Sequence, residues 1–284
     1  MDQVLTWIIQ KGDAFVGLHP HVGLMIALLA AKSVFFCLML GLAWLGTKIF
    51  IPREDQAPVF PISWSMSSVA QVFFIYVFFQ AAAVYFKDPS AAGEQLPGLM
   101  ALWAAIENLF LFALLWLYLR FGLWSNLRDV GWCRLQGSRD ISVLIRGIFF
   151  IIVLAVLTNF LYWTEILERS DKVIARVRFQ DILGSGGLAW TQLALVLLIA
   201  PVCEETFYRG FMYPVLRNRL PGAFSAVLLS LFFASGHFQW SYFVPVFLMS
   251  VACTVAYEKT RCVWVSVAIH AFYNFLVTFG VFSY

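Results

Sequence analysis

Long apolar runs separated by short polar connections dominate the chain. A helix needs roughly 20 predominantly apolar residues to cross a bilayer, and eight runs have about that length. They cover residues 22–50, 66–86, 99–121, 141–163, 187–219, 222–238, 242–257 and 262–282. Turn-rich connections at 51–61 and 87–98 separate the earlier runs. This pattern predicts an all-α fold, a polytopic transmembrane helix bundle of about eight spans.

The segment at residues 165–186 differs from its surroundings, because Lys and Arg alternate there with Val, Ile and Phe. Such a segment suits an amphipathic helix lying in the headgroup region of a membrane, and a solvated loop is the alternative. It divides the chain into N-terminal transmembrane helices at 1–164, this interfacial segment, and a C-terminal transmembrane core at 187–284.

Composition supports a membrane protein, since 62% of the 284 residues are hydrophobic, 12% are charged and the mean hydropathy is +0.82. The net charge of +3 is small and dispersed, so we expect the lipid bilayer as a partner and no nucleic acid. Basic residues gather on the side of the membrane that carries the loop after the third run. By the positive-inside rule this side is cytoplasmic and both chain termini are external. These residues include Arg120, Arg128, Arg134, Arg139, Arg146, Arg217, Arg219, Lys259 and Arg261.

Ionisable side chains inside apolar runs need an explanation, because each costs roughly 2.5–3.5 kcal/mol on insertion scales. Each is therefore a candidate for function. They are Lys32, Glu107, Glu204, Glu205, Arg209, His237 and His270.

The stretch PVCEETFYRG places two carboxylates side by side in the fifth run. Adjacent helical residues diverge by about 100°, so Glu204 and Glu205 point in different directions. Glu205 stands four residues before Arg209, the spacing of a helical ion pair, whereas Glu204 has no such partner. Pro201 removes a backbone hydrogen bond and predicts an irregular helix at this point. A simpler interpretation is that the charges mark a helix end at the cytoplasmic surface.

Two later runs carry further polar residues at helical spacing. Phe233 and His237 stand four apart near the end of the sixth run, and His270 and Asn274 stand four apart in the eighth. A single intramembrane histidine is more often a packing residue. Polar groups on three separate apolar segments can instead satisfy one another.

The order EExxxR, FxxxH, HxxxN resembles the motif set of the CPBP family, the CAAX proteases and bacteriocin-processing enzymes, which include glutamic-type intramembrane endopeptidases. The resemblance covers residues 185–282. It implies an enzyme that cleaves a membrane-associated protein or peptide. We therefore expect a multi-pass protein of a bacterial or archaeal cell membrane, with a catalytic C-terminal core.

Peptide hydrolysis requires an activated water, stabilisation of the developing oxyanion and a proton for the leaving amine. Glu204 in a cavity of low polarity suits a general base, and the resemblance implies His237 as the second member of the pair that activates water. His270 and Asn274 on one helix face are predicted to donate hydrogen bonds to the oxyanion.

The remaining motif residues, Glu205 and Arg209, are assigned to positioning and structure. A metal mechanism is an alternative, because Glu204, His237 and His270 could form a zinc site with an open water position. HExxH is absent, and the glutamate mechanism needs no ion. We expect no cofactor and no metal.

Other nucleophiles are present but explain less. The stretch Phe233-Ala-Ser-Gly is similar to the GxSG of rhomboid proteases, so a Ser235–His270 dyad is conceivable, yet it leaves Glu204 without a role. Cys203 lies in an apolar setting that disfavours the thiolate, and we interpret it as a packing residue.

Two alternatives lie outside protease chemistry. The buried Glu and His side chains, together with Lys32 and Glu107, could form a proton or ion path of a transporter. The chain could also be a non-catalytic relative that binds peptides or acts as an immunity protein. Internal inverted repeats would favour transport, and none is visible.

Depth in the membrane gives a structural prediction. Glu204 follows 17 residues of the fifth run, and His237 lies late in the antiparallel sixth, so the two side chains do not automatically lie at one depth. If the fifth helix continues to Arg219, it is about 48 Å long at about 1.5 Å per residue, and Glu204 lies near its middle. We therefore predict a long, kinked fifth helix and a short or tilted sixth.

Overall fold

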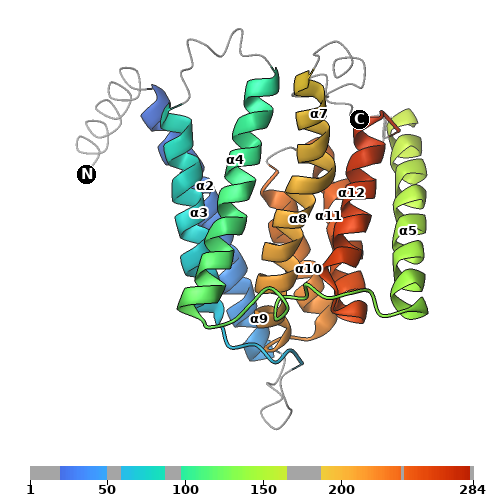
Figure 1. Cartoon of the computed structure of the whole chain (residues 1–284), viewed down its shortest axis with the longest axis horizontal. Helices are drawn as coiled ribbons and strands as arrows, with labels where there is room; N and C mark the ends of the chain where they lie inside the picture. Colours follow the sequence, from blue (N-terminus) through green and yellow to red (C-terminus); the bar gives the residue numbers. More distant parts are fainter. Residues whose placement is uncertain (1–19, 50–58, 87–96, 165–186, 238–239, 282–284) are drawn as a thin grey trace.

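The computed structural model describes residues 20–49, 59–86, 97–164, 187–237 and 240–281, and it is an all-α membrane helix bundle (Figure 1). No strand occurs among these residues. The predicted interfacial segment at 165–186 lies outside them. The separate helices are α2 (Pro20–Ile49), α3 (Met66–Phe86), α4 (Pro97–Leu117), α5 (Ser138–Trp163), α10 (Gly222–Ser235), α11 (Trp240–Thr260) and α12 (Val263–Thr278).

Four helices are long and apolar enough over their described residues to cross a membrane. These stretches are Leu29–Thr47, Trp103–Gly122, Ser138–Leu161 and Phe243–Thr260. Shorter apolar helices lie at Met66–Ala82, Gly222–Ser235 and Val263–Thr278. Each coincides with a predicted apolar run, so the all-α membrane fold is confirmed, while the number of spans stays a prediction.

The fifth run forms one continuous helical rod built from three α-helical pieces, α7 (Gly187–Ala194), α8 (Ala200–Glu205) and α9 (Tyr213–Arg217). Two π-helical stretches, Leu195–Ile199 and Thr206–Met212, join them. This confirms the predicted long fifth helix, and α10 is short, with 14 residues. The expected irregularity takes the form of π-helical turns, which are frequent at functional sites.

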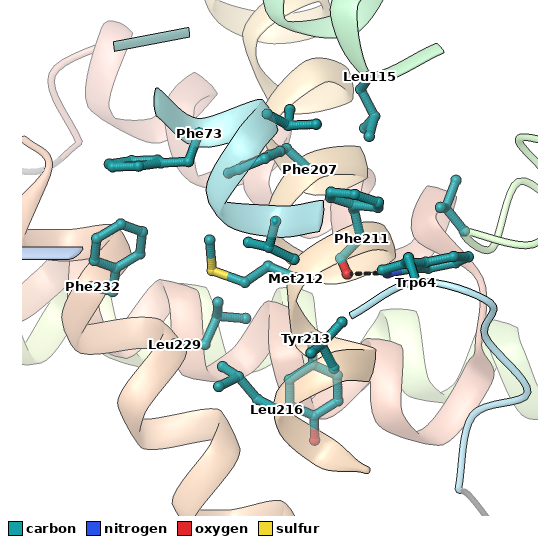
Figure 2. Packing of buried hydrophobic residues seen from close by; sticks show 14 of the residues in the cluster. Trp64, Phe73, Leu115, Phe207, Phe211, Met212, Tyr213, Leu216, Leu229 and Phe232 are labelled. Carbon is teal, nitrogen blue, oxygen red and sulfur yellow. Dashed lines mark hydrogen bonds between the residues drawn. The ribbon is translucent and has the colours of Figure 1, made fainter. Parts of the chain in front are cut away.

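Aromatic packing joins the N-terminal helices to this rod. Phe36 on α2 stacks on Phe73 of α3 with ring centroids 4.4 Å apart, and Phe232 of α10 lies within 5.7 Å of both. Figure 2 shows this cluster, in which Phe211 and Met212 of the rod lie at the centre. A second cluster joins α5, α11 and α12 around Ile151, Met249 and Ile269.

Two connections from the N-terminal half close the end of the bundle that holds α9. Asn218 exchanges two hydrogen bonds with the backbone of Phe60, at 2.8 and 2.9 Å. The Trp64 indole donates to the carbonyl oxygen of Phe211 at 2.8 Å (Figure 2). The second connection is the loop between α4 and α5, which contains Val130. Gly210 allows this loop to approach the rod, because a Cβ at Gly210 would lie 2.5 Å from the Val130 carbonyl oxygen. The π-helical stretch is thus braced by loops distant in sequence.

The outer helix α5 exposes a continuous apolar face. Ile145, Phe149, Ile152 and Val156 follow helical spacing and are each 45–66% exposed. Water would solvate such a face poorly, whereas lipid tails match it. The surface therefore agrees with a membrane environment.

All five cysteines are free. Cys203, Cys253 and Cys262 are buried, as expected of small apolar residues. The side chain of Cys37, in contrast, is exposed on α2. In the loop before α5, burial, together with a hydrogen bond to Cys262, raises the pKa of the Cys133 thiol to about 12.

Candidate active site

The two adjacent carboxylates of the fifth helix lie in different environments. Glu205 is fully buried, whereas Glu204 is half-buried and lines a cavity. The helical divergence expected from the sequence is therefore present at α8. One carboxylate belongs to a buried ion cluster and the other to a cavity wall.

The ion cluster joins three helices around Glu205. Arg209 Nη1 donates to Glu205 Oε1 at 2.8 Å, and His270 Nδ1 from α12 lies 2.8 Å from the same oxygen. Arg209 also donates to the Ser250 hydroxyl at 2.6 Å and to Thr254 Oγ1 at 3.4 Å, both on α11. Both charged side chains of the ion pair are 0% exposed. Since a carboxylate oxygen only accepts, Nδ1 of His270 carries the proton.

One oxygen of this cluster is less well satisfied. Glu205 Oε2 is buried and has no hydrogen-bond partner among the described residues. The charge of Glu205 is balanced through Oε1 alone, by Arg209 and His270. The i,i+4 pair predicted from spacing is present, and His270 is a further partner that spacing could not reveal.

Glu204 and His237 line one cavity of about 250 Å³. His237 follows the C-terminal end of α10 and is exposed, and its Nδ1 lies 3.1 Å from the Phe233 carbonyl oxygen. A carbonyl only accepts, so Nδ1 carries the proton and Nε2 keeps its lone pair. The cavity therefore holds a carboxylate and an imidazole nitrogen that can both accept protons.

The N-terminal helices supply a polar wall to the same cavity. Lys32 Nζ of α2 donates to Gln80 Oε1 of α3. Gln80 Nε2 in turn donates to the Tyr76 hydroxyl at 2.8 Å and to Glu107 Oε2 at 3.2 Å. Lys32 and Glu107 thus belong to one hydrogen-bonded network, joined through Gln80. Sequence reasoning missed Tyr76 and Gln80, although polar residues inside apolar runs were the available signal.

Phe233 lines the cavity and also contacts the ion cluster. Its ring is 1% exposed and lies 5.0 Å from the His237 ring and 5.8 Å from the His270 ring, between centroids. The guanidinium carbon of Arg209 lies 4.8 Å from the same centroid. The phenylalanine of the FxxxH motif therefore contacts both histidines and the arginine.

The structure does not gather all seven motif residues into one cavity. The cavity lining includes Glu204 and His237, whereas His270 contacts Glu205 and is 3% exposed. Asn274 Nδ2 donates to the carbonyl oxygen of Val196, at 2.9 Å, in the first π-helical stretch. The cavity therefore brings together Glu204 and His237, and the roles of all four residues in catalysis stay predictions.

The alternative nucleophiles also have defined positions. The Ser235 hydroxyl lines the cavity but donates to the Phe232 carbonyl oxygen at 2.8 Å. His270, its proposed partner, contacts Glu205 through Nδ1. Cys203 is buried, with 3% exposure.

A resident metal does not fit these positions. Within the described part of the chain no three His, Cys, Asp or Glu side chains lie close enough together to hold an ion. The zinc set considered from the sequence, Glu204, His237 and His270, is therefore not assembled.

These features define a membrane helix bundle in which a polar cavity and a buried ion cluster flank one irregular helix. Within this helix bundle, residues 186–276 match the family described as type II CAAX prenyl endopeptidase Rce1-like. The matched residues contain all three motifs. The resemblance predicted from the motifs is confirmed over this segment.

One curated relative is the UPF0177 protein YbdJ of Lactococcus lactis subsp. lactis (strain IL1403). It is 27% identical over 90 residues, which are 32% of this chain and 39% of that protein. The chain thus matches about two fifths of that relative's length. No solved structure matches the chain.

Proposed function

We propose that the chain is an intramembrane endopeptidase that hydrolyses a peptide bond in a membrane-associated protein or peptide. The observation that carries this proposal is that Glu204 and His237 share one cavity, while the adjacent Glu205 is held by Arg209 and His270. The match to CAAX prenyl endopeptidases supports it. We further propose a multi-pass position in a bacterial or archaeal cell membrane.

In the proposed reaction, a water molecule between Glu204 and His237 loses a proton to the Glu204 carboxylate. The second O–H of the water donates to Nε2 of His237, which orients the oxygen toward the substrate carbonyl. A C–O bond forms, the C–N bond breaks, and the proton held by Glu204 passes to the leaving amine. Atoms and charge balance without a metal.

The oxyanion requires donors close to the attacked carbonyl. Asn274 uses one amide N–H on Val196, so its second N–H is the donor we propose. His270 already donates Nδ1–H to Glu205, and as a cation it would also donate from Nε2. Glu205 and Arg209 act as positioning residues, because they fix the His270 ring.

The substrate class follows from the environment of the cavity. Five helical elements converge on it, and the surrounding helices are apolar on their outer faces. A polypeptide anchored in or near the bilayer can reach such a site. The family description names a CAAX prenyl endopeptidase, and a farnesylated CAAX peptide is therefore the first probe to use.

A transport function is the second candidate, because the Lys32–Gln80–Glu107 network faces Glu204 and His237 in the same cavity. Buried ionisable groups on several helices also build proton paths. Proteoliposomes with a pH-sensitive dye inside separate the two functions. Proton flux that Glu204→Gln abolishes, without peptide cleavage, would favour transport.

The decisive experiment compares Glu204→Gln with Glu107→Gln. Both variants replace one carboxylate in the same cavity by an amide, so they are matched in charge and size. Cleavage of a farnesylated, internally quenched CAAX peptide, and of membrane proteins co-expressed from neighbouring genes, reports activity. We expect Glu204→Gln to lose about 10²- to 10⁴-fold, the usual contribution of a general base, and Glu107→Gln to retain most activity.

A further inference from the structure

A second hollow lies on the outer surface of the bundle, away from the candidate active site. It is a groove of about 260 Å³ between α5 and α11. Most of its lining is apolar, including Val143 and Phe150 on α5 and Val251 and Val255 on α11. The residues that the proposed peptidase reaction uses are not part of this lining.

Small side chains create the groove. Gly147 lines it from α5, and Ala252 and Ala256 line it from α11. The Gly147 backbone packs tightly on α12, since a Cβ there would lie 2.3 Å from Ile269 Cδ1. Larger residues at these places would fill the space between the helices.

Two basic side chains, one from each helix, line the same groove. Arg146 on α5 and Lys259 in the last turn of α11 are both exposed. Neither has a carboxylate within 4.0 Å among the residues that the structure describes. The acid next to Lys259, Glu258, is engaged by Arg217 at 2.9 Å. The positive charge in the groove is therefore not balanced by a carboxylate of the described residues.

The two cations lie at the end of the bundle that carries the excess of Lys and Arg. Helix α5 begins and α11 ends at the lower end in Figure 1, where α9 and the loop before α5 also lie. The positive-inside rule predicts that this end is cytoplasmic. The cytoplasmic leaflet is the one with a negative surface potential from anionic lipids.

We propose that this groove binds one anionic phospholipid. Its acyl chain lies between α5 and α11 against the apolar lining, and its phosphate lies between Arg146 and Lys259. A guanidinium donates two parallel hydrogen bonds to a phosphate, and an ammonium adds a point charge. A neutral or zwitterionic lipid offers the same acyl chain but no net charge.

The position gives such a lipid a role near the candidate active site. Helix α11 carries Ser250 and Thr254, which hold Arg209, and α12 carries His270. Helix α5 packs on both α11 and α12. A lipid seated between α5 and α11 would therefore brace the helices that position the ion cluster.

The test is a titration of the purified full chain in detergent with dansyl-labelled phosphatidylglycerol, followed by energy transfer from its tryptophans, with unlabelled phosphatidylcholine as competitor. Each basic residue near an anionic lipid contributes about fivefold in affinity, so Arg146→Gln with Lys259→Gln should weaken binding roughly 25-fold. Ala252→Phe, which fills the acyl part of the groove, should weaken it as well.

The matched control is Arg134→Gln with Arg139→Gln, which removes two exposed charges at the same end of the bundle but outside the groove lining. It should bind within twofold of the wild type. The proposal is overturned if the groove variant binds as the wild type does, if both double variants weaken equally, or if phosphatidylcholine competes as well as phosphatidylglycerol. Because all four charges are exposed, these variants test the site even if Ala252→Phe does not fold.

Discussion

Replacing Arg209 by methionine should destabilise the folded chain strongly. Arg209 and Glu205 are both 0% exposed, and their ion pair has an N–O distance of 2.8 Å. Methionine fills much of the same space but leaves a buried carboxylate whose remaining partner is His270. Breaking a buried ion pair from one side costs about 3–5 kcal/mol.

The magnitude should lie near the lower end of that range. His270 keeps its contact with Glu205 Oε1, and Thr254 keeps a hydrogen bond to the Ser250 carbonyl oxygen at 2.8 Å. The lost contacts are those of the guanidinium with Glu205, with the Ser250 and Thr254 hydroxyls and with the Phe233 ring. We therefore expect about 3 kcal/mol, which raises the unfolded fraction by about two orders of magnitude.

The assay is reversible unfolding in mixed micelles, followed by circular dichroism as the denaturing detergent is raised. Arg217→Met is the matched control, because Arg217 also forms an ion pair with a glutamate, Glu258. The side chains of Arg217 and Glu258 are 21% and 27% exposed. Such a pair contributes about 0–1 kcal/mol. Adding Glu205→Gln to Arg209→Met should restore part of the loss, since the two residues interact. An Arg209→Met variant within 1 kcal/mol of the wild type would refute the buried-cluster account.

Two further predictions concern the π-helical stretch. Gly210→Ala should lower the free energy of unfolding by about 1–3 kcal/mol, because its Cβ would lie 2.5 Å from the Val130 carbonyl oxygen. Gly41→Ala is the control and should be neutral or stabilising, because nothing lies within 4 Å of its Cβ. Equal melting temperatures for the two variants would contradict this. Trp64→Phe should lower the free energy of unfolding by about 1 kcal/mol, because the hydrogen bond to the Phe211 carbonyl oxygen is lost while ring packing persists. An unchanged free energy of unfolding would show that this hydrogen bond contributes nothing.

Much of the fold could be predicted from the sequence because the governing signals are local. The length of an apolar run sets the length of a membrane helix, and the ends of the described helices agree with those of the predicted runs to within about four residues. The turn of about 100° per residue likewise separated Glu204 from Glu205 and paired Glu205 with Arg209. These predictions needed no knowledge of how helices pack.

The arrangement between helices could not be predicted in the same way. His270 contacts Glu205 across a sequence separation of 65 residues, and its ring lies 5.8 Å from that of Phe233, between centroids. The Gln80 bridge between Lys32 and Glu107 likewise depends on the packing of α2, α3 and α4. Hydropathy identifies which residues are buried but not which buried polar groups meet.

The π-helical turns also could not be predicted from the sequence. Pro201 predicted an irregular helix, but the irregularity at Thr206–Met212 comes from one wider turn, which leaves the hydrophobic pattern almost unchanged. That wider turn begins directly after Glu205. The local backbone around the candidate base therefore had to come from the structure.

In the proposed reaction Glu204 supplies the base and Glu205 does not. The most direct measurement is the rate of peptide release by purified Glu204→Gln, compared with wild type and Glu107→Gln, on a substrate that the wild type cleaves. The account predicts a loss of about 10²- to 10⁴-fold for Glu204→Gln with an unchanged melting temperature, and most activity retained in Glu107→Gln. Cleavage by Glu204→Gln at the wild-type rate would contradict it.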